Sequence, residues 1–241
     1  MPHSTANGDR PPGQVAVVVA AAGRGERLGG ALPKALAKVA ERALLDYTLE
    51  IIATVPEVDM VVVAGPPGYE SEVQQICDRW PAKPTTIVTG GLTRKASVTK
   101  ALKELPAVVE VVLIHDAARA FAPRELFSEV IAAVHSGSDA VVPGLPVADT
   151  IKRVDAGESV LETVDRSSLR GVQTPQGFDR GALYDAHRKT VEGTDHTDDA
   201  GIVASYGFPV LVVPGKPEAF KVTTPFDIAV ARAVLADKSR R

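Results

Sequence analysis

Apolar positions follow two different periods along the first half of the chain. Four runs rich in β-branched residues have the length of buried strands, and they cover residues 14–20, 59–65, 85–89 and 108–115. Between them, residues 44–55 and 97–105 place apolar side chains at the spacing of an amphipathic helix. Strands that alternate with helices predict βαβ units and a mostly parallel central sheet.

Each of the two helical stretches predicts one buried face. The apolar stripe of the first is Leu45, Leu49 and Ile52, and that of the second is Val98, Ala101, Leu102 and Leu105. We assign both stripes to the hydrophobic core, because helices that cover a sheet bury such a face. The predicted fold class is therefore α/β, in a three-layer, Rossmann-like arrangement.

The pattern changes after Pro146. Residues 147–168 contain two short polar strands around a turn at Asp155, Ala156 and Gly157, which predicts a projecting β-hairpin arm. A two-stranded arm is marginally stable alone, so we expect it to pack against a second subunit. An ordinary mobile surface loop is the alternative.

The remaining chain returns to alternating elements. Helices are predicted over 180–190, 198–206 and 225–236, with strands at 211–215 and 219–223. We predict a single domain over 14–236, because no internal repeat or linker divides this part of the sequence. Polar residues and helix breakers predict mobile tails at 1–13 and 237–241.

Composition narrows the class of protein. The chain has 241 residues, 45% of them hydrophobic, which is enough for a substantial core. A net charge of -3 and a pI near 6.0 argue against a nucleic-acid-binding surface. Cys77 is the only cysteine, so we expect no intrachain disulfide and a reducing, cytoplasmic location. The apolar stretch at 15–22 is too short to span a membrane.

A glycine-rich loop follows the first predicted strand. Its glycines are Gly23, Gly25, Gly29 and Gly30, and its cations are Arg24, Arg27 and Lys34. Glycines allow backbone N–H groups to approach phosphate oxygens, and open α/β sheets bind ligands at the carboxyl ends of their strands. Pro33 fixes the backbone beside Lys34, so the lysine can reach back over the loop. These features predict a phosphate-binding site.

Three other interpretations of this loop compete with the phosphate site. A dinucleotide site needs a glycine fingerprint that leads directly into a helix, whereas Pro33 delays the helix here. A P-loop needs Gly-Lys-Ser/Thr at its end, which the loop lacks. A solvated glycine turn with incidental arginines is the third alternative, and Lys34 after Pro33 disfavours it.

An ordered series of motifs resembles a known family. Gly23, Gly25, Arg27 and the Pro33–Lys34 pair match the G-x-G-x-R loop and Pro-Lys pair of nucleotidyltransferases of the nucleotide-diphospho-sugar transferase fold. The later motifs are GGLTRKASV (90–98), HDAARAF (115–121), DTIKR (149–153), TVDR (163–166), QTPQGF (173–178) and FKVTTPFD (220–227). Together they are similar to the 2-C-methyl-D-erythritol 4-phosphate cytidylyltransferases of the non-mevalonate isoprenoid pathway.

The resemblance implies a role for each matched residue. Catalytic roles fall on Arg27, Lys34, Arg166 and Lys221, and nucleotide binding on Ala21, Ala22, Gly23, Gly25, Gly91 and Ser97. Contacts to 2-C-methyl-D-erythritol 4-phosphate fall on Asp116, Arg119, Thr150, Thr174 and Thr197. It also implies a homodimer in which Thr150 and Arg166 of the arm reach the partner's site.

The implied reaction transfers CMP from CTP to the acceptor's phosphate and releases pyrophosphate. The second pKa of a phosphate monoester is about 6, so its attacking oxygen needs no general base at neutral pH. Repulsion between two anions is the obstacle, and cations with magnesium would overcome it. Asp116 is the expected carboxylate near the magnesium. His115 and His196 lack a cluster with ligand spacing, so we assign neither to a metal.

Some positions depart from the family pattern. Ala35 stands where relatives often carry glutamine, and Leu92 and Lys95 stand where acidic or polar residues are common. A ribitol 5-phosphate cytidylyltransferase is an alternative because its glycine loop and phosphate-binding cations would look much the same, and transfer to a sugar 1-phosphate or a molybdopterin is a more distant one. A non-catalytic nucleotide-binding module is the alternative from a different class.

Overall fold

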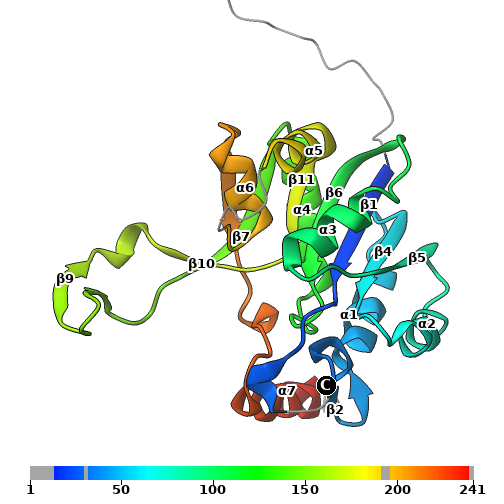
Figure 1. Cartoon of the computed structure of the whole chain (residues 1–241), viewed down its shortest axis with the longest axis horizontal. Helices are drawn as coiled ribbons and strands as arrows, with labels where there is room; N and C mark the ends of the chain where they lie inside the picture. The colour runs from blue at the N-terminus through cyan, green and yellow to red at the C-terminus, as the bar shows by residue number, and fades with distance from the viewer. Residues whose placement is uncertain (1–13, 30–31, 191–195, 239–241) are drawn as a thin grey trace, which may run out of the picture.

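A central eight-stranded sheet organises the part of the chain that this computed structural model describes, which comprises residues 14–29, 32–190 and 196–238 (Figure 1). The strands of this sheet are β1 (Gln14–Ala20), β4 (Met60–Gly65), β5 (Thr85–Thr89), β6 (Val109–Asp116), β7 (Ala140–Pro146), β10 (Arg170–Val172), β11 (Gln176–Asp179) and β12 (Val210–Pro214). Two small hairpins pair β2 (Lys38–Val39) with β3 (Arg42–Ala43), and β8 (Ile151–Val154) with β9 (Val160–Val164).

Helices connect most of these strands. The α-helices are α1 (Leu44–Ala53), α2 (Glu70–Cys77), α3 (Arg94–Leu102), α4 (Arg124–His135), α5 (Arg180–Lys189), α6 (Asp199–Ser205) and α7 (Pro225–Lys238). Short 3-10 turns are η1 (Glu26–Leu28), η2 (Lys34–Leu36), η3 (Arg166–Ser168) and η4 (Pro217–Ala219). None of the helices in the described ranges is long and apolar enough to cross a membrane.

The sheet order is β10-β7-β11-β6-β1-β4-β5, and β12 pairs with β7. The pairs that β1 forms with β4 and β6 are parallel, as are the β4–β5 and β7–β12 pairs. β11 runs antiparallel to both β6 and β7. The predicted mostly parallel α/β sheet is confirmed, with two reversed strands, β11 beside its centre and β10 next to β7.

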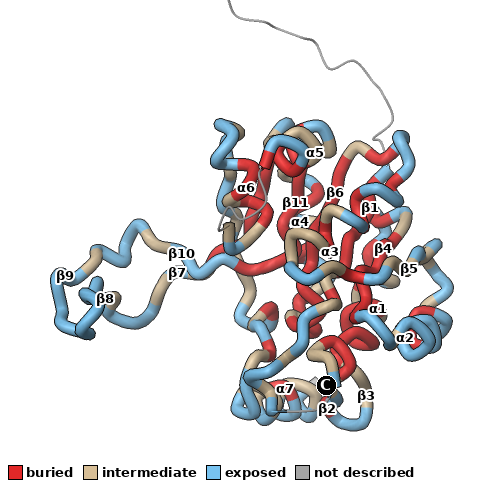
Figure 2. Tube along the Cα trace, viewed as in Figure 1, coloured by how far each residue is buried: buried red, intermediate tan, exposed pale blue. Residues whose placement is uncertain are grey.

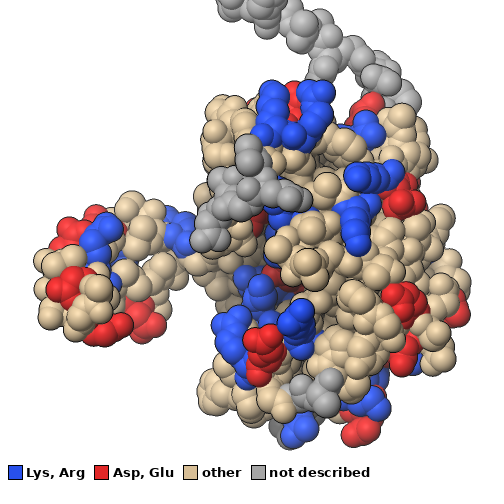
Figure 3. Space-filling model, in the orientation of Figure 1, with Lys and Arg blue, Asp and Glu red and all other residues tan. Residues whose placement is uncertain are grey.

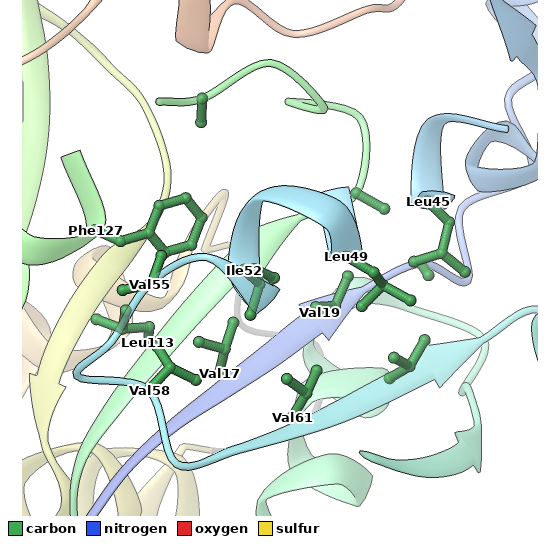
Figure 4. Packing of buried hydrophobic residues seen from close by; sticks show 14 of the residues in the cluster. Val17, Val19, Leu45, Leu49, Ile52, Val55, Val58, Val61, Leu113 and Phe127 are labelled. Carbon is green, nitrogen blue, oxygen red and sulfur yellow. The ribbon is translucent and has the colours of Figure 1, made fainter. Parts of the chain in front are cut away.

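Residues of β1 alternate between two hydrophobic clusters. Val17 and Val19 pack with α1, α2 and α4 on one face of the sheet, and Figure 4 shows them against Leu49 and Ile52 of α1. Ala16 and Val18 pack with α3, α5 and α6 on the other face. Because both faces are covered, the central strands are apolar throughout, as in other parallel sheets. The predicted three layers are therefore present.

The predicted strand at 219–223 is wrong. Among the described residues this segment has no ladder partner, and its Val222 N–H instead donates to the Ala118 carbonyl of the loop after β6 at 2.8 Å. The Phe220 ring stacks on Phe121 at 5.9 Å, in a third cluster that includes Ala231 of α7. The apolar pattern of 219–223 therefore reflects packing under the sheet edge.

The predicted β-hairpin arm is confirmed. Residues between β7 and β10 leave the body of the molecule and form β8 and β9, which extend far to the left in Figures 1 and 2. Asp155 closes the turn, because its Oδ1 accepts from the N–H groups of Gly157 and Ser159, each at 2.9 Å. Val160 and Leu161 of β9 are exposed. Packing of the arm against a second subunit stays a prediction.

The predicted tails fall mostly outside the described residues. The N-terminal tail predicted at 1–13 and the end at 239–241 both do so. α7 continues to Lys238, past the predicted domain boundary at residue 236, because Asp237 and Lys238 include no helix breaker.

Candidate active site at the carboxyl edge of the sheet

The glycine-rich loop folds back on itself after β1. The Lys34 N–H donates to the Gly23 carbonyl at 3.0 Å, and Gly25 adopts a φ of 75°. A Cβ at Gly25 would lie 2.9 Å from the Cβ of Lys34, so only glycine permits this close approach. The backbone at Lys34 therefore returns to the loop, and the reach of its side chain over the loop stays a prediction. Gly30 lies outside the described residues.

Lys34 lies in a region of surplus positive charge. Its side chain is half-buried, and burial together with the nearby charges of Lys221 and Arg27 lowers its pKa to about 8. Asp116 and Asp227 oppose this shift only in part. A bound anion would stabilise the charged form of this lysine, which suits a phosphate site.

Asp116 is the centre of a polar pocket of about 210 Å³. Its Oδ2 lies 2.7 Å from Lys221 Nζ, and its Oδ1 accepts from Arg94 Nε at 3.1 Å. Although burial alone would raise the pKa of Asp116, these two cations hold it well below its usual range. The carboxylate therefore stays ionised and fixed at the end of β6.

Arg119 and Thr174 form the opposite wall of this pocket. Arg119 is anchored by its Nη1, which donates to the Ala219 carbonyl at 2.7 Å, and by its Nη2, which donates to the Val172 carbonyl at 3.1 Å. The Thr174 hydroxyl accepts the Asp116 N–H at 3.0 Å and contacts His115 Nδ1 at 3.1 Å. Burial lowers the pKa of His115 to about 4, so the imidazole beside Thr174 is neutral.

The Gly90–Gly91 segment, which follows β5, packs against the glycine-rich loop. A Cβ at Gly90 would lie 2.3 Å from the Ala22 Cβ, which brings this segment directly against the glycine-rich loop. The Gly91 N–H donates to Ser97 Oγ at 3.0 Å, and the Ser97 hydroxyl donates to the Thr93 carbonyl at 2.9 Å. The start of α3 is thereby fixed at the same edge of the sheet as the pocket.

Comparison with known proteins decides the family. The model of the family described as IspD, 2-C-methyl-D-erythritol 4-phosphate cytidylyltransferase, matches residues 15–237. This chain belongs to that family. The protein of that name from Saccharopolyspora erythraea is 48% identical over 229 residues, which cover 92% of this chain and 99% of the relative.

Solved structures agree with this assignment. The structure titled 2-C-methyl-D-erythritol 4-phosphate cytidylyltransferase from Thermus thermophilus is 38% identical, with a TM-score of 0.74, and the match covers 92% of this chain and 98% of that one. A 4-diphosphocytidyl-2C-methyl-D-erythritol synthase from Anaerococcus prevotii has a TM-score of 0.82 at 30% identity, over 93% and 99% of the two chains. The family assignment therefore rests on both sequence and fold.

Most of the predicted site residues lie at the carboxyl edge of the central sheet. Thr197 lines the pocket beside Asp116, Arg119, Thr174 and Lys221. The nucleotide candidates lie in the two glycine segments, and Arg27 belongs to η1 within the first of them. The expected clustering of acceptor residues is present, whereas their roles stay predictions.

Two predicted residues lie elsewhere. Thr150 and Arg166 line a separate hollow of about 310 Å³ at the arm, and Arg166 Nη1 donates to the Ala148 carbonyl. Neither residue lines the Asp116 pocket of its own chain. A role for them in catalysis therefore requires an arm from another subunit.

Sequence reasoning missed Arg94 as a site residue. It lines the pocket, and its guanidinium joins Asp116 to Asp199, whose side chain is fully buried. The available signal was its place shortly after the Gly90–Gly91 pair, beyond the carboxyl end of β5. His187, which contacts Asp199, gave no such signal because it lies on the apolar face of α5.

The protein groups near the pocket fit a metal ion only in part. Within the described ranges, no group of three or more His, Cys, Asp or Glu side chains could hold one. Both oxygens of Asp116 already contact cations, so direct coordination there would have to displace Arg94 or Lys221. The arrangement suits an ion that arrives on nucleotide phosphates better than one held by a protein cluster.

Proposed function

We propose that this chain transfers CMP from CTP to 2-C-methyl-D-erythritol 4-phosphate, giving 4-diphosphocytidyl-2-C-methyl-D-erythritol and pyrophosphate. The observation that carries the proposal is the meeting of Lys34, Lys221 and Arg94 at the Asp116 edge, in a chain that matches this family over 15–237. The reaction joins two anions, so it needs convergent cations at this edge.

The proposed chemical step is an in-line attack by the acceptor's phosphate oxygen on the α-phosphorus of CTP. Arg27 and Lys34 stabilise the charge that grows on the α-phosphate and the leaving pyrophosphate, while Lys221 holds the incoming phosphate. Asp116 and Thr174 face the acceptor. No side chain has to remove a proton, so catalysis consists of positioning and charge stabilisation.

The nucleotide would occupy the two glycine segments. Gly23 has open space above it, since a Cβ there would meet nothing within 4 Å. Backbone N–H groups of this loop can therefore approach phosphates closely. Ala21, Ala22, Gly91 and Ser97 would then lie beside the cytidine, as the family resemblance implies.

The proposal includes a homodimer with composite sites. The exposed apolar residues of β9 and the separation of Arg166 from its own pocket support an arm that serves a partner subunit. In that arrangement Arg166 would help Lys221 to orient the incoming phosphate, and Thr150 would contact the acceptor.

Three further parts of the proposal have indirect support. Magnesium, carried mainly by the CTP phosphates, would supply charge neutralisation during transfer. The single cysteine, which is buried, supports a reducing cytoplasmic location. Figure 3 shows basic and acidic side chains interspersed on the visible face, which supports the absence of a nucleic-acid partner.

Pyrophosphate release by the purified protein tests the function. We expect release with CTP, magnesium and 2-C-methyl-D-erythritol 4-phosphate, and much less when ATP, GTP or UTP replaces CTP. Ribitol 5-phosphate in place of the acceptor is the matched control for acceptor identity. Faster release with ribitol 5-phosphate would overturn the acceptor assignment, and silence with every pair would favour a nucleotide-binding module.

A further inference from the structure

A chain of polar contacts runs from the protein interior to the pocket. His187 Nε2 lies 3.0 Å from Asp199 Oδ1, and the other oxygen of Asp199 accepts from Arg94 Nη1 at 2.5 Å. Arg94 then contacts Asp116, which contacts Lys221. The five side chains come from α5, α6, α3, the end of β6 and the segment after η4.

Asp199 is the most deeply buried carboxylate in this series of contacts. Its side chain is 0% exposed, and burial alone would raise its pKa, but Arg94 and the His187 hydrogen bond lower it. The carboxylate is therefore ionised, and His187 Nε2 must carry the hydrogen that it shares with Asp199. His187 Nδ1 in turn contacts Thr99 Oγ1 of α3 at 3.2 Å.

Arg94 connects this buried end to the pocket. Its side chain is 28% exposed and lines the pocket, whereas the carboxylate that holds its Nη1 is inaccessible. A long arginine at a pocket wall has several rotamers, and a buried partner on Nη1 selects one of them. The selected rotamer directs Nε to Asp116.

We propose that Asp199 and His187 are positioning residues for the acceptor half of the active site. They hold Arg94, and Arg94 holds the Asp116 carboxylate in place when Lys221 turns from Asp116 to the incoming phosphate. This inference rests on the proposed function, because it assigns Asp116 and Lys221 to the acceptor. Neither positioning residue contacts the substrate.

The glycine-rich loop of the nucleotide half takes no direct part in this series of contacts, whereas Gly91 and Ser97 flank Arg94 at the start of α3. The glycine-rich loop is fixed by its own backbone, through the Lys34 to Gly23 bond and the tight packing of Gly25. Loss of the Asp199 charge should therefore weaken acceptor binding much more than CTP binding.

The variant Asp199→Asn tests the inference, because it keeps the shape of the side chain and removes its charge. We expect the KM for 2-C-methyl-D-erythritol 4-phosphate to rise about tenfold to a hundredfold, with a much smaller change in the KM for CTP. The milder variant His187→Leu keeps the Asp199 charge, and we expect a smaller rise of the same KM. This second variant keeps the test open should Asp199→Asn fail to fold.

Asp46→Asn is the matched control. Asp46 is also a buried aspartate, and it accepts from Arg42 Nε, Arg79 Nη1 and Trp80 Nε1, but it lies on α1 and lines neither pocket. Both Asp→Asn changes should lower the melting temperature, since each removes a buried carboxylate charge that pairs with arginine. Only Asp199→Asn should change the acceptor KM.

Calorimetry of acceptor binding, without turnover, distinguishes failure of the proposed function from failure of the positioning role. If the wild-type protein does not bind 2-C-methyl-D-erythritol 4-phosphate, the proposed function fails. If it binds, and Asp199→Asn binds it equally well or raises the KM for CTP to the same extent, the positioning role is overturned. Equal acceptor KM values for Asp199→Asn and Asp46→Asn would show a purely structural role.

Discussion

The surroundings of Lys34 disfavour the charged form of its side chain. Burial and the neighbouring cations lower its pKa to about 8, so the free protein holds the ammonium only weakly above neutral pH. A bound triphosphate would reverse this balance, because its negative charge favours the protonated form. Nucleotide binding and protonation of Lys34 are therefore linked at this residue.

This linkage predicts a pH dependence of CTP affinity. Below pH 8 Lys34 is mostly charged, and above it mostly neutral, so affinity should fall as the pH rises from about 7 to 9.5. We expect a loss of about tenfold by calorimetry. Lys34→Arg stays charged throughout this range and should show a much flatter profile, and identical slopes in both proteins would contradict the prediction.

Individual site residues differed in how far sequence could reveal them. Lys34 was predictable because its signal is local, namely a proline and a glycine loop within a few residues. Arg94 was not, because its partners Asp116 and Asp199 are 22 and 105 positions away along the chain. Only the assembled sheet brings those three side chains together.

At the scale of elements, the arm is the part whose proposed role depends on a second copy of the chain. Arg166 lines the hollow on the arm and Lys34 belongs to the loop after β1. If each active site takes its loop from one subunit and its arm from the other, a dimer can contain one intact site although each of its chains carries a defect.

Mixed dimers test this arrangement. Arg166→Ala and Lys34→Ala should each be nearly inactive alone, whereas an equal mixture should recover up to about a quarter of wild-type activity after subunit exchange, because half of the dimers are mixed and each has one intact site. Pyrophosphate release measures the recovery, and differently tagged chains prove the exchange. Inactive mixtures with proven exchange would argue against shared sites.

Elements were predictable where burial imposes a simple pattern. The runs that became β1, β4 and β6 are interior strands covered by helices, so they are largely apolar and easily found. The segment at 219–223 has the same apolar character, but it packs on Phe121 under the sheet edge instead of joining a ladder. Composition alone does not distinguish these two environments.

At the scale of the whole molecule, His115 links stability to pH. It is fully buried next to Phe127, and burial lowers its pKa from 6.5 to about 4. The unfolded chain therefore binds a proton below about pH 6.5 that the folded chain takes up only near pH 4. This contribution to stability is complete above pH 6.5 and is lost as the pH falls toward 4.

We predict that the free energy of unfolding decreases by about 3 kcal/mol between about pH 7 and about pH 4 through this one group. Urea denaturation at several pH values measures the decrease. The variant His115→Gln has no titrating ring, so its stability should change much less over the same range. A wild-type curve that is flat down to about pH 4.5 would refute the prediction.

The reversed strand β11 has a mechanical consequence. The chain leaves the sheet at the end of β7, forms the arm, and returns through β10 to the same edge, where Gln173 and Thr174 line the pocket immediately before β11. The arm and the pocket wall are thus consecutive parts of one backbone. The three residues of β10, which pair with β7, connect the arm to this wall, so we expect a change in the position of the arm to reach the acceptor side of the pocket through this one short strand.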